Sequence, residues 1–171
     1  TPPTSGNNVP HVLISEVQPG TENGAEDEFV ELYNPTDQAV SLVGFALKKK
    51  SSSGSESNLV SSGAFTGAIT AHGFFLVAHK NYQFAGSANL IYSANSNNLA
   101  YTNNTVTLYN ASGAAVDEVS WAEIEKGTSS ERKAFANSSC ISAQGGGELL
   151  GNGCDTDSQN DFETRQTSQP Q

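Results

Sequence analysis

The sequence predicts an all-β protein, an antiparallel β-sandwich of about seven to nine short strands. Three observations favour this class. Short segments rich in β-branched and aromatic residues recur along the chain, clusters of Gly, Pro, Asn and Ser separate them, and no segment keeps a helical hydrophobic period. A chain of 171 residues is long enough to bury a core as one domain.

Eight segments are predicted to form strands, namely His11–Val17, Glu28–Asn34, Val40–Leu47, Phe65–Thr70, Gly73–His79, Thr105–Asn110, Ala114–Trp121 and 131–136. The first is a run of β-branched residues. In the second, alternate residues face opposite sides, Phe29, Glu31 and Tyr33 against Val30 and Leu32. The turn residues Asn34, Pro35, Thr36 and Asp37 end this strand.

The third and fifth segments are apolar on both faces, which is typical of central strands. Gly44 interrupts the third and indicates a bulge or a close backbone approach. Between them, residues 48–63 form a polar excursion that we expect to be a hairpin tip. Residues 80–104 are rich in Asn and Ser and predict no regular element.

The last strands form a hairpin around Ala111, Ser112 and Gly113, followed by a final short strand. The predicted organisation is a flexible linker over residues 1–10, a sandwich over residues 11–136, and a C-terminal extension over residues 137–171 that is rich in Gly, Ser and Asn.

The charge balance excludes two classes of partner. Eight Lys and Arg residues stand against 18 Asp and Glu residues, which gives a formal net charge of −10. Nucleic-acid binding depends on cations that neutralise phosphates, so no nucleic-acid partner is expected. An anionic membrane surface is disfavoured for the same reason. No segment has the length of apolar sequence that membrane insertion requires.

Both cysteines, Cys140 and Cys154, lie in the C-terminal extension. Neither has a His or a second Cys at the spacing of a zinc site. A disulfide between them is the better interpretation, and it implies an oxidising compartment. We expect this bond to tie the extension to the sandwich.

Five stretches carry a family resemblance. They are LISEVQPG (13–20), DEFVELYNPTDQAVSLVGFAL (27–47), AITAHGFFLVA (68–78), VTLYNASGAAVDEVSW (106–121) and GTSSER (127–132). In this order they resemble the lamin-tail domain over residues 11–135. Phe45 stands where that family often has Trp, and the excursions at 48–63 and 80–104 depart from its pattern. The matching residues, to which the resemblance gives structural roles, are Glu16, Phe29, Glu31, Leu32, Tyr33, Asn34, Pro35, Gly44, Asp117 and Arg132.

The resemblance implies an immunoglobulin-like sandwich without chemistry of its own. Animal members form the tail of nuclear intermediate filaments, whereas bacterial and archaeal relatives are commonly found in exported or surface proteins. The chain lacks coiled-coil heptads, and its tail is typical of an exported protein. We therefore expect a prokaryotic secreted or cell-surface protein. The resemblance also implies that Phe162 packs onto the sandwich.

The residues do not predict an enzyme. Three histidines, His11, His72 and His79, stand at strand ends and in a turn, and no G-x-S-x-G motif is present. Glu16 and Glu31 occupy corresponding places on two early strands, but no cleft for a sugar is predicted between them. For these glutamates and for Asp117 we expect backbone N–H groups or Arg132 as partners.

The extension also contains a candidate calcium loop, Asp155, Asp157 and Asp161. It does not meet the EF-hand signature, because Gln159 and Asn160 replace the third ligand and the glycine. A second acidic cluster comprises Glu22, Glu26, Asp27 and Glu28. We expect both to be solvated loops and the protein to need no cofactor, with bound calcium as the alternative.

Two functions follow from these observations. The first is a non-catalytic structural or interaction module of an exported protein, whose partner is a protein or a glycan. The alternative is a calcium-stabilised carbohydrate-binding module that stacks sugars on Trp121, Tyr82, Tyr92 and Tyr101. A hydrolase is a remote third alternative.

Overall fold

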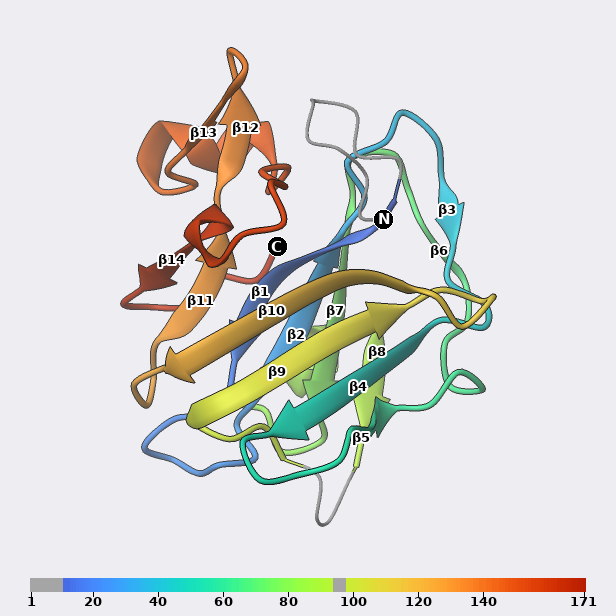
Figure 1. Cartoon of the computed structure of the whole chain (residues 1–171), viewed down its shortest axis with the longest axis vertical. Coiled ribbons are helices and arrows are strands. Elements are labelled where there is room, and N and C mark those ends of the chain that lie inside the picture. The colour runs from blue at the N-terminus through green and yellow to red at the C-terminus, as the bar shows by residue number, and fades with distance from the viewer. Residues whose placement is uncertain (1–10, 94–97) are drawn as a thin grey trace.

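The chain folds into a sandwich of two β-sheets with a compact extension at one side, as the computed structural model in Figure 1 shows. The structure describes residues 11–93 and 98–171, so the predicted linker over residues 1–10 lies outside the described residues. In Figure 1 the four-stranded sheet lies in front of the six-stranded sheet. The predicted all-β sandwich is confirmed.

The larger sheet has the spatial order β14 (Phe162–Arg165), β11 (Ser129–Arg132), β1 (Leu13–Gln18), β2 (Phe29–Tyr33), β7 (Phe74–His79) and β8 (Leu90–Tyr92). The smaller sheet has the order β10 (Ala115–Glu123), β9 (Thr102–Tyr109), β4 (Ala46–Ser51) and β5 (Ser57–Val60). Two ribbons pair β3 (Val40–Ser41) with β6 (Ala68–Ile69) and β12 (Ala134–Ala136) with β13 (Ser139–Ile141). Three 3₁₀ turns are η1 (Ala85–Ser87), η2 (Gly145–Leu150) and η3 (Gln159–Asp161). Neighbouring strands are antiparallel, except that β8 runs parallel to β7.

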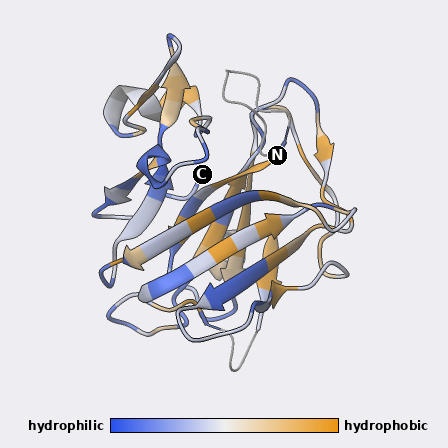
Figure 2. Ribbon diagram, viewed as in Figure 1, coloured by the Kyte–Doolittle hydropathy of each residue, from blue (hydrophilic) through white to orange (hydrophobic). Residues whose placement is uncertain are grey.

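The core lies between the two sheets and follows the alternation predicted for β2. Val30 and Leu32 join the central cluster, which the smaller sheet completes with Val106 and Leu108. Apolar and polar residues alternate along the strands of the smaller sheet in Figure 2. Phe29, on the other face of β2, packs with Leu76, Ala78 and Tyr82 in a second cluster on the outside of the larger sheet. That outer face is therefore covered as well, by the segment that contains η1.

The predicted strand Val40–Leu47 is wrong as one element, because the chain turns at Gly44. Gly44 has φ of +85°, and Phe45 N–H donates to Leu42 O at 2.9 Å, so β3 and β4 belong to different sheets. A Cβ on Gly44 would lie 2.9 Å from the Cβ of Ala111. The expected close approach at this glycine is thus present, and only glycine adopts this backbone without strain.

Asn34 explains the turn that follows β2. Its side chain is fully buried, and its Nδ2 donates to the carbonyls of Gln38, Ile69 and Thr70 at 2.7–3.2 Å. Its Oδ1 accepts from Thr36 N–H at 3.0 Å. One amide side chain therefore fixes the turn and holds it against the loop before β7.

The polar stretches contain more structure than their sequences indicate. The excursion at 48–63 is the tip of a hairpin between β4 and β5, and the stretch at 80–104 contributes η1, β8 and the start of β9. Among the described residues, no helix has the length and hydrophobicity of a membrane-spanning helix.

The C-terminal extension is folded onto the sandwich, but not through its disulfide. The predicted bond between Cys140 and Cys154 is confirmed, with Cα atoms 5.3 Å apart, yet both ends lie within the extension. The expected tie to the sandwich is instead β14, which pairs with β11 and becomes the edge of the larger sheet. Phe162, at the start of β14, packs against the central core.

Candidate functional site

Arg132 is the buried centre that joins the extension to the sandwich. Its side chain is 1 % exposed. Nε donates to Ile14 O of β1 at 2.8 Å, and one terminal nitrogen donates to Cys154 O of the extension at 2.7 Å. The other terminal nitrogen reaches both carboxylate oxygens of Asp117 at 2.6 and 2.8 Å. The guanidinium also lies 4.5 Å from the ring centroid of Phe162.

Asp117 has both kinds of partner that the sequence led us to expect. Besides the two bonds from Arg132, it accepts Ile14 N–H of β1 at 2.6 Å. Burial raises the pKa of the Asp117 carboxyl, and the Arg132 guanidinium opposes that rise. The pair therefore connects β10 of one sheet to β1 and β11 of the other, which is a structural arrangement.

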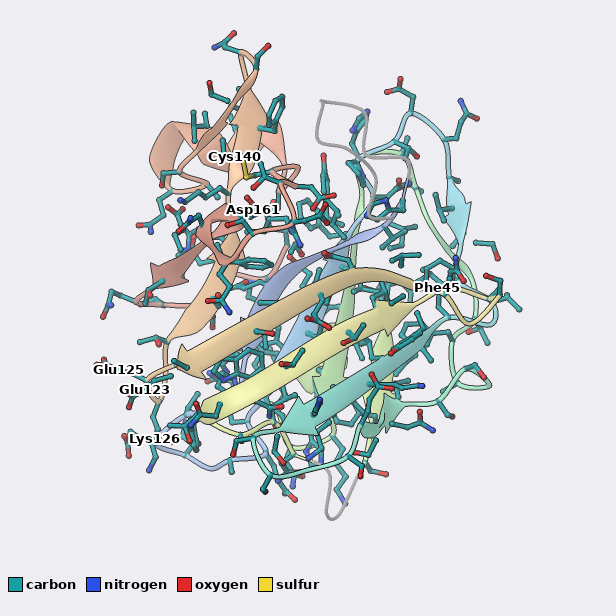
Figure 3. All side chains as sticks on the ribbon, viewed as in Figure 1. Phe45, Glu123, Glu125, Lys126, Cys140 and Asp161 are labelled. Carbon is teal, nitrogen blue, oxygen red and sulfur yellow. A yellow bond between two sulfur atoms is a disulfide. The ribbon has the colours of Figure 1, made fainter. Side chains whose placement is uncertain are left out.

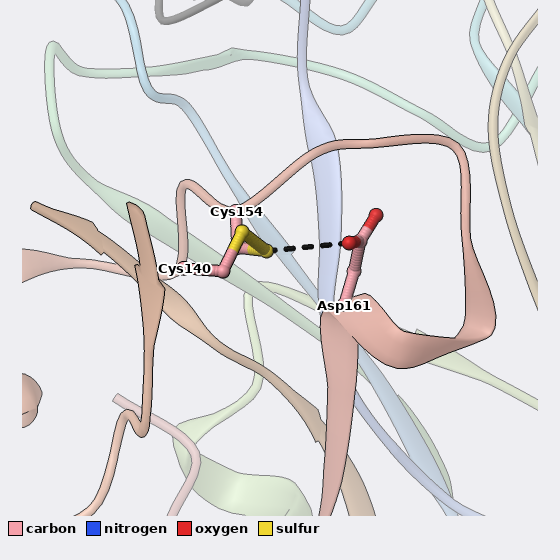
Figure 4. A group of neighbouring side chains, drawn as sticks. All are labelled: Cys140, Cys154 and Asp161. Atoms are coloured by element: carbon pink, nitrogen blue, oxygen red, sulfur yellow. Dashed lines mark hydrogen bonds between the residues drawn. A yellow bond between two sulfur atoms is a disulfide. The ribbon is translucent and has the colours of Figure 1, made fainter. Parts of the chain in front are cut away.

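The three aspartates of the candidate calcium loop lie around this arginine. Asp155 is 3.6 Å from the Arg132 guanidinium and 3.6 Å from the His11 ring, and Asp161 is 4.0 Å from the same guanidinium. Asp161 also accepts from Thr156 N–H at 2.7 Å, and its Oδ1 lies 3.3 Å from the disulfide sulfur of Cys154, the contact drawn in Figure 4. Asp157 is exposed. Asp155 and Asp161 thus already have protein partners, the Arg132 guanidinium for both and an N–H donor for Asp161.

We expect millimolar calcium to leave the thermal midpoint within about 1 °C of its value in excess chelator, because Arg132 already neutralises the inward carboxylates. Differential scanning fluorimetry of the wild type and of Asp157→Asn checks this. A calcium-dependent rise of several degrees that Asp157→Asn abolishes would establish a calcium site in this loop.

Two residues of the second acidic cluster, Asp27 and Glu28, are turned inward and hydrogen-bonded, whereas Glu22 is exposed. Asp27 accepts from Thr21 Oγ1 at 2.6 Å and from Gln83 N–H at 2.9 Å. Glu28 is fully buried and accepts from Tyr92 Oη at 2.8 Å and from Leu99 N–H at 2.7 Å. Burial raises the pKa of Glu28 to about 7. The carboxyls of Asp27 and Glu28 bind loop residues, so the expectation of a solvated loop is wrong for these two residues.

Three buried glutamates lie side by side on the outer face of the larger sheet. Glu16 of β1 is in register with Glu31 of β2 on one side and with Glu131 of β11 on the other. The C-terminal strap (residues 166–171) covers them: Gln171 N–H donates to Glu31 at 2.5 Å and Ser168 Oγ donates to Gln18 at 2.6 Å. Because like charges stand on neighbouring strands, this face favours protonated carboxyls.

The pKa values of two of these carboxyls are raised. Burial raises the pKa of Glu16 to about 7 and that of Glu31 to about 8, and the neighbouring glutamates add to both shifts. Hydrogen bonds from Ser129 to Glu16 and from Ser15 to Glu31 act in the opposite direction. Arg165 lies 3.2 Å from Glu131. The predicted partner Arg132 binds Asp117 rather than either of these glutamates.

The remaining candidates do not form a catalytic or sugar-stacking site. The hydrogen-bond and ion-pair partners of the three histidines, within the described residues, are Asp155 for His11, Tyr33 and Asp37 for His72, and Asn81 for His79. None of these is a serine or cysteine nucleophile. Trp121, Tyr82 and Tyr92 are each less than 10 % exposed. Burial disfavours sugar stacking on these three rings, whereas Tyr101, the fourth candidate, is half-buried, with Lys126 Nζ 5.7 Å from its ring centroid.

The open side of the sandwich carries a feature that the sequence did not indicate. β10 is the edge of its sheet and pairs with β9 alone among the described strands. Two cavities of about 280 and 410 Å³ follow one another along it, between β10 and the β11–β14 side of the molecule. We call them together the β10 groove. Residues 117–120 line the first cavity, and Trp121, Glu123, Ile124 and Glu125 line the second.

Comparison with models of known protein families finds a match. The family model described as Lamin Tail Domain matches residues 5–123, well over half of the 171 residues. The match ends with β10, so β11 and the extension with β14 lie beyond it. A search of curated proteins finds no match.

Proposed function

Because the chain belongs to the lamin tail domain family, we propose that it is a non-catalytic structural module of an exported or cell-surface protein, and that it binds a protein partner along the edge of β10. The family consists of immunoglobulin-like domains without enzymatic activity. Function in such a fold depends on its surfaces, and an open edge strand is a surface that accepts another strand.

The β10 edge is the observation that carries this proposal. In antiparallel pairs, alternate residues direct their backbone groups away from the neighbouring strand. Glu118 N–H donates to Asp117 Oδ1 at 2.8 Å. From this bond and from the alternation along a strand, we assign Glu118, Ser120 and Ala122 to the outward set. Ser120 and Ala122 thus offer backbone groups toward the β10 groove. The nine residues of β10 span about 30 Å at the usual rise of a strand, enough for a partner strand.

The disulfide and the charge support the proposed setting. Disulfides persist in oxidising compartments, and this one closes a loop within the extension. The net charge of −10 disfavours nucleic acid and anionic membranes as partners.

A proline at Ser120 tests the edge without disturbing the ladder to β9. Ser120→Pro removes the outward N–H, and proline is tolerated on an edge strand whose N–H faces solvent. Ser120→Thr is the matched control, because it keeps the N–H and the hydroxyl that contacts Thr105 Oγ1 at 2.9 Å. Both variants should keep a cooperative thermal transition.

Pull-down from an envelope fraction should then recover a protein with the wild type and Ser120→Thr that Ser120→Pro does not retain. Capture that is equal for all three proteins, or absent for all three, would overturn binding at this edge.

A further inference from the structure

The β10 groove is lined by apolar side chains and by polar ones. Val119 and Phe162 lie in the first cavity and Trp121 and Ile124 in the second, so apolar side chains follow the groove along its length. All four belong to the central core or pack against it. The outer wall of the second cavity consists of small polar residues, Thr128, Ser129, Ser130 and Thr164. An extended chain suits this groove better than a helix does, because it can add to the β10 edge through main-chain hydrogen bonds.

The charged residues along the groove are predominantly negative. The lining residues of the two cavities include seven carboxylates, from Asp117, Glu118, Glu123, Glu125, Asp155, Asp157 and Asp161, and one guanidinium, that of Arg132. Arg132 is already bound to Asp117. Figure 3 shows Glu123 and Glu125 at the far end of β10, beside Lys126. Lys126 has contacts of its own, at 3.9 Å to Glu22 and 5.7 Å to the ring of Tyr101.

The same charges argue against a second copy of this chain as the occupant. Two β10 edges that paired would bring acidic side chains into one interface, and each chain has a net charge of −10. Charged residues on an edge strand prevent such self-pairing while they leave the backbone groups available to a partner of opposite charge.

We infer that the strand received by the β10 groove is a basic extended segment of the partner protein, with Lys or Arg at alternate positions. This rests on the proposed function and names the chemistry of its partner. Cationic side chains at one end of the segment face Asp157, and those at the other end face Glu123 and Glu125. The intervening small or β-branched residues lie over Val119 and Trp121, and the backbone pairs with Ser120 and Ala122.

Synthetic peptides test this chemistry. The probe is an octapeptide in which Lys alternates with Thr and Val, and its matched control has Glu in place of every Lys. Titrations of isotope-labelled protein, followed by the amide signals of Ser120 and Ala122, should show binding of the basic peptide alone, weakening as salt rises. Ser120→Pro, which has no amide signal at position 120, should abolish the shift of Ala122, and Ser120→Thr should keep the shifts at both positions.

The charge contribution is measured with a double variant. Glu123→Gln with Glu125→Gln should weaken the basic peptide about tenfold, as expected when two carboxylates near bound cations are neutralised. Asp37→Asn with Glu56→Gln removes two charges outside the groove and should leave the affinity unchanged. If both peptides shift the β10 amides equally, the basic partner is wrong and edge binding stands. If neither peptide shifts them, both the partner chemistry and the edge proposal fail.

Discussion

Arg132→Met should lower the free energy of unfolding by about 3–5 kcal/mol, the usual cost of removing one partner of a buried ion pair. The substitution leaves Asp117 without its bidentate partner in a position where its side chain is 7 % exposed. It also leaves the carbonyls of Ile14 and Cys154 without the donor that joins them. Denaturant unfolding followed by the fluorescence of Trp121, the single tryptophan, measures the change.

Two further variants separate this effect from the loss of any surface cation. Lys133→Met removes the neighbouring cation, whose Nζ donates to Asn160 O at an exposed site, and should change the free energy of unfolding by less than about 0.5 kcal/mol. Arg132→Met combined with Asp117→Leu should recover part of the loss, because no buried charge is left unpaired. A loss below about 1 kcal/mol for Arg132→Met alone would mean that the extension is held by β14 pairing and not by this arginine.

Stability should fall as the pH rises from about 5 to about 8.5, by roughly 6 kcal/mol for Glu16 and Glu31 together. The pKa values of Glu16 and Glu31 are about 7 and about 8 in the folded protein, against 4.5 without the fold. Below pH 4.5 both folded and unfolded chains hold these protons, and the stabilisation is fully present. Between pH 4.5 and 8 the unfolded chain releases them first, so the folded state binds more protons and loses stability as pH increases. The raised pKa of Glu28 also lowers the stability of the folded state as the pH increases.

Glu31→Gln should flatten this dependence. At pH 8.5 the variant should be more stable than the wild type by about 4–5 kcal/mol, because it needs no proton to remain neutral on the buried face. At pH 5 the two should be nearly equal, since the hydroxyl of Ser15 can rotate to pair with the amide. Glu22→Gln, at a side chain that is 82 % exposed, should leave the profile unchanged. Parallel profiles for wild type and Glu31→Gln would show that Glu31 is ionised throughout this range.

The sequence predicted the parts of the fold that depend on hydrophobic alternation. The two faces of β2, the hairpin of β9 with β10 and the class of the fold follow from that signal. Gly44 was recognised as unusual, but its positive φ, which sends β4 into the other sheet, is a tertiary property. β14 was missed because Phe-Glu-Thr-Arg has one apolar residue and because its partners in β11 lie 30 to 36 residues away in sequence.

The sequence indicated which residues of the candidate site have structural roles, but it indicated few of the residues that they contact. An arginine was among the partners expected for Asp117, yet nothing local indicates that the same Arg132 side chain also bonds the carbonyls of Ile14 and Cys154. The acidic loop suggested calcium because spacing shows oxygen ligands and cannot show a guanidinium that arrives from another strand. Glu131 was not singled out, since its register with Glu16 exists only once β11 lies beside β1.

The order of strands at the β14 side also determines how the molecule transmits force. β1 and β14 both pair antiparallel with β11, so they run parallel to each other, and the beginning of β1 and the end of β14 lie at opposite ends of this three-strand segment. A pull between those two points is directed along the strands. It loads the hydrogen bonds on both sides of β11 in shear and at the same time, instead of opening them one after another. The pairing of β14 with β11 therefore lets the extension resist a pull along the strands.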